Sequence, residues 1–315
     1  MFTFKQLEAV HWIARTGSFV SAAEQLHTTQ AGISKRIREL EQIVGESLFD
    51  RSARKVRLTA KGAILAQGAE PLLRQRQALM DELVEPRYVD RVVHIGVTEL
   101  VSSTWLARYL IALQERFPRL SIRPHVDFSD DLLAKADAQA LDLIVIPRFA
   151  EQPGFVRREL GAAQFDWLAT PGIKARWAGR GVATPGAATP GVATPCAAAS
   201  VDIPLLMQGS GSGLGFITER HLQHSQQLGR NQVLRTNSLL PLVGMTLAGQ
   251  GVSFLPTGYL RAEIAAGRLV AVDTGLSNEP VVYDILYRQE LRSALFDQLT
   301  QLAGECCDFS TSFLA

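Results

Sequence analysis

Residues 17–45, GSFVSAAEQLHTTQAGISKRIRELEQIVG, decide the fold of the amino-terminal part of this 315-residue chain. The stretch predicts two helices, capped by Ser18 and Thr29, with a break at His27-Thr28 between them. Four apolar residues of the second helix recur at helical spacing and are expected to face a core: Ile33, Ile37, Leu40 and Val44. Two such helices joined by a short turn form a helix-turn-helix.

The polar side chains of the second helix are expected to face away from that core. Gln30, Ser34 and Lys35 carry amide, hydroxyl and ammonium groups, which reach base edges and phosphates when a helix lies in the major groove of DNA. We therefore predict that this is a recognition helix. The candidate DNA contacts, including residues of the following hairpin, are Thr29, Gln30, Ser34, Lys35, Arg36, Arg51 and Arg54.

Two further elements surround the helix pair. A helix over residues 3–16 ends at Gly17, with Leu7, Val10 and Ala14 on its core face. Residues 47–51 and 55–58 flank a polar turn and predict a two-stranded wing. Its basic residues are expected to contact phosphate, although for any single one a solvated surface hairpin is an equally good interpretation.

Charge is unevenly distributed along the chain. The net charge is only +1, but residues 1–65 hold ten Lys and Arg against six Asp and Glu, a net of +4, which leaves −3 for the remainder. A local basic excess is what a DNA-binding surface requires. The charge therefore agrees with the helix-turn-helix prediction.

A long helix is predicted from Thr59 to Glu85-Pro86, with a hinge at residues 86–90. Its apolar residues form a stripe that we call the seam: Leu58, Leu65, Ala69, Leu72, Leu79 and Leu83. A stripe that continues beyond a compact module favours dimerisation, and packing on its own domain is the alternative. Pro71 predicts a kink or a break, and Arg76 also falls on the seam.

From residue 92 onward strands alternate with helices, which predicts a parallel α/β sheet. The expected strands are 92–97, 120–126, 141–146, 166–169, 252–255 and 281–287. The expected helices are 106–117, one through Leu132 and Leu133, 214–224, 239–248 and 294–303.

The chain resembles the LysR-type transcriptional regulators. The phrases that carry the resemblance are Phe4-Lys5-Gln6-Leu7, Gly17-Ser18-Phe19, Ala22-Ala23, Leu26-His27, Gln30, Ile33-Ser34, Ile37-Arg38, Leu40-Glu41, Leu48-Phe49-Asp50-Arg51 and Leu58-Thr59-Ala60-Lys61-Gly62. Thinner matches follow at Phe117-Pro118, Leu141-Asp142-Leu143, Ala248-Gly249-Gln250-Gly251-Val252 and Leu255-Pro256. The resemblance spans nearly the whole chain, with most of its specificity before residue 62.

The resemblance implies an α/β protein with an amino-terminal winged helix-turn-helix, a long linker helix and a two-lobed effector domain similar to periplasmic binding proteins. The expected bounds are 1–62 for the DNA-binding domain, 63–86 for the linker helix and 90–315 for the effector domain. Lobe I is expected at about 90–160 and 268–300, and lobe II at about 161–267. The family is usually tetrameric, so the partners expected are a second copy as homodimer or homotetramer, and double-stranded DNA with a pseudo-palindromic operator.

A small-molecule effector is expected between the lobes, where strands end and helices begin. The candidate contacts are Thr98, Ser102, Ser103, Pro147, Arg148, Gln208, Ser210 and Asn237. Backbone N–H groups and hydroxyls at these places favour an acidic or strongly polar effector. For residues 209–213, a flexible glycine-serine loop remains the alternative.

Other features exclude several classes. The start of the chain has no secretion signal, no run of about eighteen apolar residues occurs, and the three cysteines lack zinc or disulfide spacing, so a cytoplasmic location is expected. The repeats GVATP, GAATP and GVATP at 181–195 predict an exposed loop. We expect no metal and no cofactor, because only His221 and His224, three apart on one helix, approach a ligand spacing.

Three other functions were weighed. An enzyme would need a nucleophile and a base, and no such pair stands out. A transport-type binding protein would need an export signal and would not carry a helix-turn-helix. An architectural DNA protein would not need a two-lobed cleft.

Overall fold

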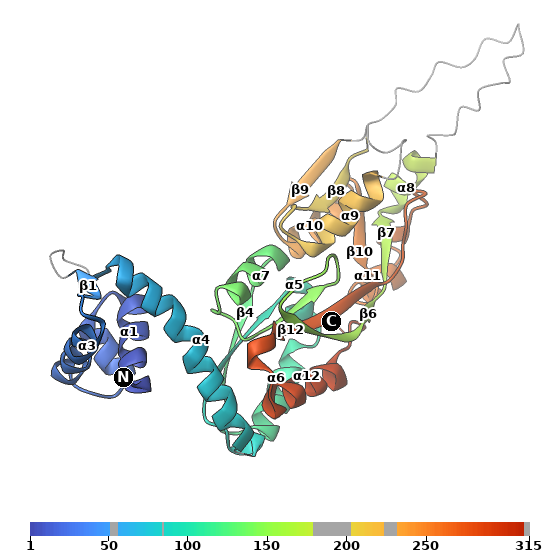
Figure 1. Ribbon diagram of the computed structural model, residues 1–315. Helices are drawn as coiled ribbons and strands as arrows, with labels where there is room; N and C mark the ends of the chain where they lie inside the picture. Colours follow the sequence, from blue (N-terminus) through green and yellow to red (C-terminus); the bar gives the residue numbers. More distant parts are fainter. Residues whose placement is uncertain (51–55, 84, 179–202, 224–231, 312–315) are drawn as a thin grey trace, which may run out of the picture. The chain divides into compact units, whose positions relative to one another are not determined.

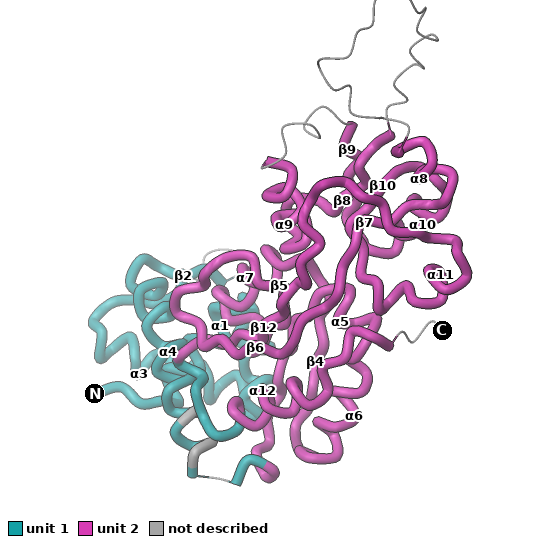
Figure 2. Tube along the Cα trace, turned by 90° about the vertical axis from the view of Figure 1, so that its right-hand side faces the viewer, with its two compact units in different colours: residues 1–86, 290–295 teal, residues 87–289, 296–315 magenta. Residues whose placement is uncertain are grey.

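The computed structural model describes residues 1–50, 56–83, 85–178, 203–223 and 232–311 (Figure 1). The GVATP repeats, Arg51, Arg54, Cys196 and His224 lie outside these residues. The chain forms two compact units, residues 1–86 with 290–295 and residues 87–289 with 296–315 (Figure 2).

Three helices form the helix-turn-helix part of unit 1, and the second and third begin at the predicted caps. Helix α1 (Phe4–Thr16) follows Thr3, whose side chain and that of Gln6 form a capping box. Helix α2 (Phe19–Gln25) follows Ser18, and α3 (Gln30–Val44) follows Thr29. Left-handed glycines end α1 and α3, at Gly17 with φ 67° and at Gly45 with φ 78°.

The core of this unit is the predicted one with two exceptions. Ile33, Ile37 and Leu40 of α3 are fully buried against α1 and α2. Val44, expected on the same face, is exposed because it is the last residue of α3. On α1, Leu7 and Val10 are buried as expected. Ile13 is buried in place of Ala14, which was expected at the core and is exposed.

The wing is shorter than predicted. Strands β1 (Phe49–Asp50) and β2 (Arg57–Leu58) pair antiparallel, with Phe49 opposite Leu58. The expected ends of both strands, at Arg51 and Lys55, lie outside the described residues.

Helix α4 (Ala60–Leu83) runs for 24 residues and continues through Pro71, so of the kink or break predicted at this proline the break does not occur. A proline removes one backbone hydrogen bond, but packing holds the turns on either side of it. Ala69, two residues before the proline, is buried against the module, and Arg76, five residues after it, forms an ion pair of 2.8 Å with Glu8 of α1. Arg76 therefore lies against its own module.

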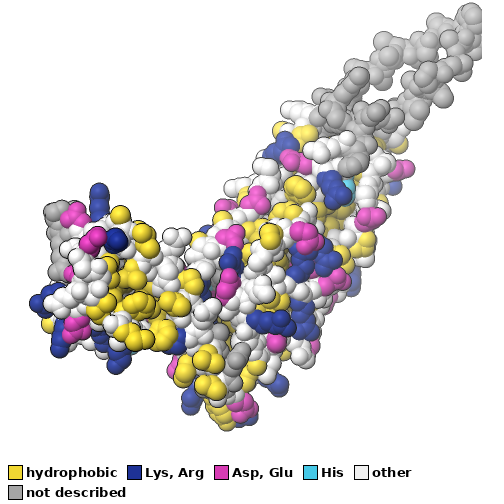
Figure 3. Space-filling model, in the orientation of Figure 1, with side chains coloured by type: hydrophobic (Ala, Val, Ile, Leu, Met, Phe, Trp, Pro, Cys, Tyr) yellow, Lys and Arg dark blue, Asp and Glu magenta, His cyan; other side chains and the backbone are white. Residues whose placement is uncertain are grey.

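The apolar seam divides into two parts. Leu65 packs on the core of its own module, and Ala69 is 1% exposed. Further along, Leu72, Leu79 and Leu83 are 42%, 57% and 74% exposed. Apolar side chains gather on the face of this unit seen in Figure 3, and its exposed apolar residues also include Phe4 and Ile64. Only the first part of the seam is covered within the chain.

Unit 2 has two lobes, each built on a five-stranded sheet of described residues. In lobe I the strand order is β4 (Ser121–Val126), β3 (Val92–Val97), β5 (Leu143–Pro147), β12 (Val281–Arg288) and β6 (Phe155–Ala163). Its helices are α5 (Glu99–Thr104), α6 (Leu106–Arg116), α7 (Ser129–Asp137) and α12 (Ala294–Cys306). The central strand β5 is buried along its whole length.

In lobe II the order is β11 (Val270–Ala271), β7 (Phe165–Ala169), β10 (Val252–Pro256), β8 (Leu205–Gln208) and β9 (Val233–Thr236). Its helices are α8 (Pro171–Ala178), α9 (Gly213–Gln223), α10 (Leu239–Leu247) and α11 (Arg261–Ala265). Short 3-10 turns occur at Pro86–Tyr88 and Gln289–Leu291. None of the helices in the described ranges is long and apolar enough to cross a membrane.

The expectation of parallel sheets is only partly right. Strands β3, β4 and β5 run parallel, as do β8, β9 and β10, but β12 and β7 are antiparallel to their neighbours. Strand β12 returns from lobe II and therefore enters its sheet from the opposite end. The chain passes from lobe I to lobe II after β6, which ends at Ala163, and returns after β11, which ends at Ala271. The expected boundaries were at about 160 and 268.

Candidate functional site

Helix α3 presents the predicted DNA contacts as a polar face. Gln30 and Lys35 are exposed and Ser34 is half-buried, while Ile33 and Ile37 face the core. Lys35 Nζ lies 3.9 Å from the Glu39 carboxylate, which is a weak surface ion pair, and the Lys35 side chain is 75% exposed. These groups are accessible to DNA.

The other predicted contacts differ in accessibility. The Thr29 hydroxyl accepts a hydrogen bond of 3.1 Å from the Gly32 N–H, so its first role is to cap α3. Arg36 is half-buried on α3. Arg51 and Arg54 belong to the wing turn outside the described residues.

The second candidate site is a cavity between the lobes of unit 2, which we call the cleft. Its volume is about 440 Å³, within the range of roughly 300–1,000 Å³ typical of small-molecule sites. It lies beyond the carboxyl ends of β3 and β5 in lobe I and of β8 and β9 in lobe II. Four predicted effector contacts line it: Thr98, Pro147, Gln208 and Asn237.

Four other predicted contacts do not line the cleft. The Ser102 hydroxyl donates to the carbonyl of Glu99 in its own helix, at 2.8 Å, and Ser103 faces Tyr259. Ser210 is exposed on the loop before α9. Arg148 lines a separate hollow of about 810 Å³ with Phe216 and Arg220, among others.

Glu99, which no signal in the sequence indicated, joins the two lobes through its carboxylate. Its Oε1 accepts a hydrogen bond of 2.7 Å from the Ser238 hydroxyl. Oε2 accepts from the Leu239 N–H at 2.5 Å, and Oε1 also accepts from the Leu240 N–H at 3.2 Å. A lobe I side chain thus caps the first turn of α10 in lobe II, where the helix dipole favours a negative charge.

Two more hydrogen bonds cross the cleft. The Gly213 N–H at the start of α9 donates to the Ser129 hydroxyl at 3.1 Å, and the Asp130 N–H donates to the Gly211 carbonyl, also at 3.1 Å. Glycine is required at position 213, because a Cβ there would lie 2.6 Å from Pro147 Cγ. The lobes are therefore closed on each other at this edge.

The hydroxyl groups of Thr98 and Tyr283 face each other in the cleft wall. Tyr283 is fully buried, and neither its hydroxyl nor that of Thr98 has a hydrogen-bond partner among the described residues by distance and angle. Burial raises the pKa of Tyr283, and the facing Thr98 offsets that rise only in part, so the phenol is neutral. Buried polar groups without partners are uncommon in folded proteins and are satisfied by water or a ligand.

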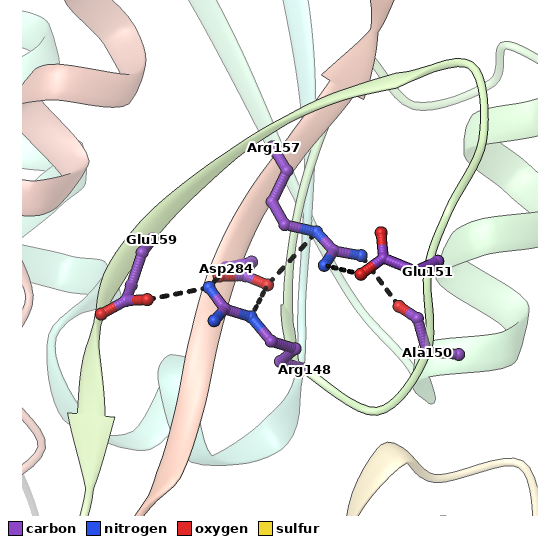
Figure 4. Close-up of polar contacts among 6 residues, drawn as sticks. All are labelled: Arg148, Ala150, Glu151, Arg157, Glu159 and Asp284. Atoms are coloured by element: carbon purple, nitrogen blue, oxygen red, sulfur yellow. Dashed lines mark hydrogen bonds and ion pairs between the residues drawn. The ribbon is translucent and has the colours of Figure 1, made fainter.

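Arg148 has a structural role that its sequence position did not reveal. Its guanidinium binds the buried Asp284 carboxylate of β12 through two hydrogen bonds, of 2.8 Å from Nε and 2.5 Å from Nη2 (Figure 4). Arg157 lies 3.5 Å from the same carboxylate, and Glu159 binds Arg148 from the other side. The partners raise the pKa of Arg148, the Asp284 hydrogen bonds most of all. The cluster fastens β5, β6 and β12 together.

We expect Arg148→Met to lower the free energy of unfolding by about 2–3 kcal/mol. The variant leaves the buried Asp284 with Arg157 alone, but Arg148 is 38% exposed, so the loss is smaller than for a fully buried pair. Urea unfolding followed by tryptophan fluorescence measures the change. Arg158→Met on β6, the strand that carries Arg157, is the control, because Arg158 is exposed and forms no ion pair within the described ranges. Equal midpoints for the two variants would contradict the structural role.

Nothing in the described part of the chain suggests a metal centre. No group of three His, Cys, Asp or Glu side chains there is arranged to hold a metal ion. Cys306 is buried and Cys307 half-buried, and burial raises the pKa of both thiols.

A recognition helix beside a wing, joined by a long helix to a two-lobed α/β domain with a polar cleft, defines a DNA-binding regulator with an effector domain. Residues 4–63 match the bacterial regulatory helix-turn-helix proteins of the lysR family, and residues 87–307 match the LysR substrate binding domain. The chain belongs to the LysR family of transcriptional regulators. Members of this family are regulators, not enzymes, which removes the enzyme alternative.

Known relatives agree with this family. The HTH-type transcriptional regulator BbuR of Bordetella bronchiseptica is 26% identical over 262 residues, 82% of this chain and 76% of BbuR. The structure of ArgP from Mycobacterium tuberculosis covers 97% of this chain and 97% of its own, with a TM-score of 0.67 and 21% identity. Full-length LysG from Corynebacterium glutamicum with bound effector Arg covers 97% of this chain and 98% of its own, with a TM-score of 0.62 and 18% identity. The two structures show a shared fold.

Proposed function

We propose that this chain binds a specific operator in double-stranded DNA through α3 and regulates transcription from it. The observation that carries the proposal is the exposed polar face of α3, with Gln30 and Lys35 outward and Ile33 and Ile37 buried. This geometry lets the helix enter the major groove while its opposite face stays packed. Ser34 and Lys35 supply base or phosphate contacts, and Arg51 and Arg54 of the wing turn supply phosphate contacts.

The DNA-bound form is a homodimer or a homotetramer acting in the cytoplasm. Support comes from the part of the seam that the chain itself leaves uncovered, at Leu72, Leu79 and Leu83. A two-fold pair of modules presents its recognition helices to half-sites about one helical turn apart, so the operator is pseudo-palindromic. The proposal includes no cofactor.

A small polar effector bound in the cleft controls the activity. Unpartnered hydroxyls of Thr98 and Tyr283 and the side chains of Gln208 and Asn237 supply polar groups for it. A ligand that binds one arrangement of the lobes more tightly shifts the population toward that arrangement. The Glu99 cap on α10 is one contact whose formation depends on that arrangement.

A mobility shift with DNA from immediately upstream of the coding sequence, in the presence of nonspecific competitor, tests the DNA-binding part. Ser34→Ala and Lys35→Ala should each cost about 1–3 kcal/mol of binding, a roughly five- to hundredfold rise in Kd. Lys5→Ala, which removes an exposed lysine from α1 of the same unit, is the matched control and should bind normally.

Binding that resists competitor, weakened by both α3 variants and unchanged in the control, supports the proposal. If none of the upstream fragments shifts at moderate salt, sequence-specific binding is rejected. If every DNA binds equally and salt alone weakens the complex, the protein is an architectural DNA binder.

A further inference from the structure

The charged groups lining the cleft are all acidic. Glu99, Asp127 and Asp131 line the cavity, and none of the described residues lining it is a lysine or an arginine. Lys135, one turn after Asp131 on α7, forms an ion pair of 2.5 Å with Asp127. Its hydrogen bond lowers the pKa of the Asp127 carboxyl, so that carboxyl is ionised near neutral pH. Counting Lys135, the cleft keeps an excess of two negative charges.

Two of the backbone positions that could bind an anion are already occupied. The first N–H groups of α10 donate to the Glu99 carboxylate. The Gly213 N–H at the start of α9 donates to Ser129. Helix amino termini are the usual backbone sites for a carboxylate or a phosphate. At the start of α10, a negatively charged effector would have to displace the Glu99 carboxylate and then face Asp127 and Asp131.

The buried hydroxyl of Tyr283 offers a polar group to a ligand in the cavity. Tyr283 is fully buried, it lines the cleft, and its hydroxyl has no hydrogen-bond partner in the described ranges. A hydroxyl both donates and accepts, so it serves a neutral or a charged polar group. The acidic side chains, Asp131 in particular, decide the charge of what binds.

We propose that the effector is a small organic cation, such as an amine or a guanidine, whose positive charge lies against Asp131 and whose polar atoms reach the Tyr283 and Thr98 hydroxyls. This rests on the proposed function, because it assigns the ligand class of the same cleft. Asp131 is exposed on α7, and its carboxyl group lies beside that of Asp127, which forms the ion pair with Lys135. One ammonium thus faces two carboxyl groups, and a cationic ligand would add the second positive charge. An acidic effector, one of the two classes expected from the sequence, does not suit this lining.

The test uses the full-length protein and three matched series of probes, α,ω-diamines with chains of about three to six carbons and the diols and dicarboxylates of the same lengths. Thermal unfolding at constant ionic strength and titration calorimetry report binding. We expect at least one diamine to raise the melting temperature and to bind at least tenfold more tightly than the diol and the dicarboxylate of its length. Asp131→Asn should weaken that diamine at least tenfold.

Asp137→Asn is the control, since Asp137 lies on the same helix, is exposed, does not line the cleft and forms an ion pair of 2.9 Å with Arg288. It should bind the diamine as the unmodified chain does. The proposal is overturned if no diamine binds, if a dicarboxylate or diol binds as tightly, or if Asp131→Asn and Asp137→Asn behave alike. A dicarboxylate that binds and alters the operator complex would reject the cation and leave the proposed function intact. Absence of an operator complex would reject the proposed function, whatever the diamines do.

Discussion

Replacing Leu72 and Leu79 together by glutamate should convert the protein to a monomer and weaken operator binding at least about a hundredfold. Both side chains lie on α4 two turns apart, and they are 42% and 57% exposed within the chain. In a dimer they would be buried against their counterparts, where an unpaired carboxylate is costly. Separate monomers lose the gain in affinity that comes from binding two linked half-sites.

The mass in solution, measured by light scattering on a sizing column, reports the assembly against a chain mass of 34.4 kDa. Ala63→Glu with Gln67→Glu adds the same two charges on the opposite side of α4, where both residues are exposed, and should keep the mass and DNA binding of the unmodified protein. A glutamate variant at 72 and 79 that keeps the oligomeric mass would show that dimerisation uses another surface.

The amino-terminal unit was predictable in detail because its signals are local. A polar cap lies at the start of each helix, a glycine with positive φ ends α1 and α3, and the core residues follow helical spacing. Ala14 and Val44 were predicted to be buried and are exposed. Helical spacing alone does not show at which residue a helix ceases to contact the core. At Pro71 the helix does not break, because packing on both sides outweighs one lost hydrogen bond.

The effector cleft was less predictable because long-range contacts form it. Glu99 meets Leu239 from 140 residues away, and no local pattern indicates that a carboxylate will cap a helix of the other lobe. Arg148 illustrates the converse, since its place after a buried strand suggested a ligand contact. Its partner Asp284, 136 residues further on, makes it part of the sheet instead. These residues come together through the strand order of the two sheets and through the two places where the chain passes between the lobes. The sequence specified neither of these closely enough to predict the contacts.

The phrase Leu58-Thr59-Ala60-Lys61-Gly62 was recognised only as a resemblance, and the structure supplies its physical reason. The Thr59 N–H donates to the Leu48 carbonyl at 3.0 Å, and the Thr59 hydroxyl donates to the Ser47 carbonyl at 2.8 Å. The same hydroxyl accepts from the Gly62 N–H at 3.1 Å, as a helix cap does. The start of α4 is thereby held against the backbone just before the wing, which leaves no room for a side chain at Gly62.

Gly62→Ala should therefore destabilise the protein by at least about 3 kcal/mol and reduce DNA binding with it. The added Cβ would lie 1.9 Å from the Leu48 carbonyl oxygen, and because that oxygen belongs to the backbone, the start of α4 must move and lose the Thr59 contacts. Gly68→Ala is the control within the same helix, since a Cβ there meets nothing within 4 Å. It should stabilise α4 by about 1 kcal/mol through helix propensity. Urea unfolding followed by circular dichroism compares the two variants. A urea midpoint of Gly62→Ala at or above that of Gly68→Ala would refute the steric requirement.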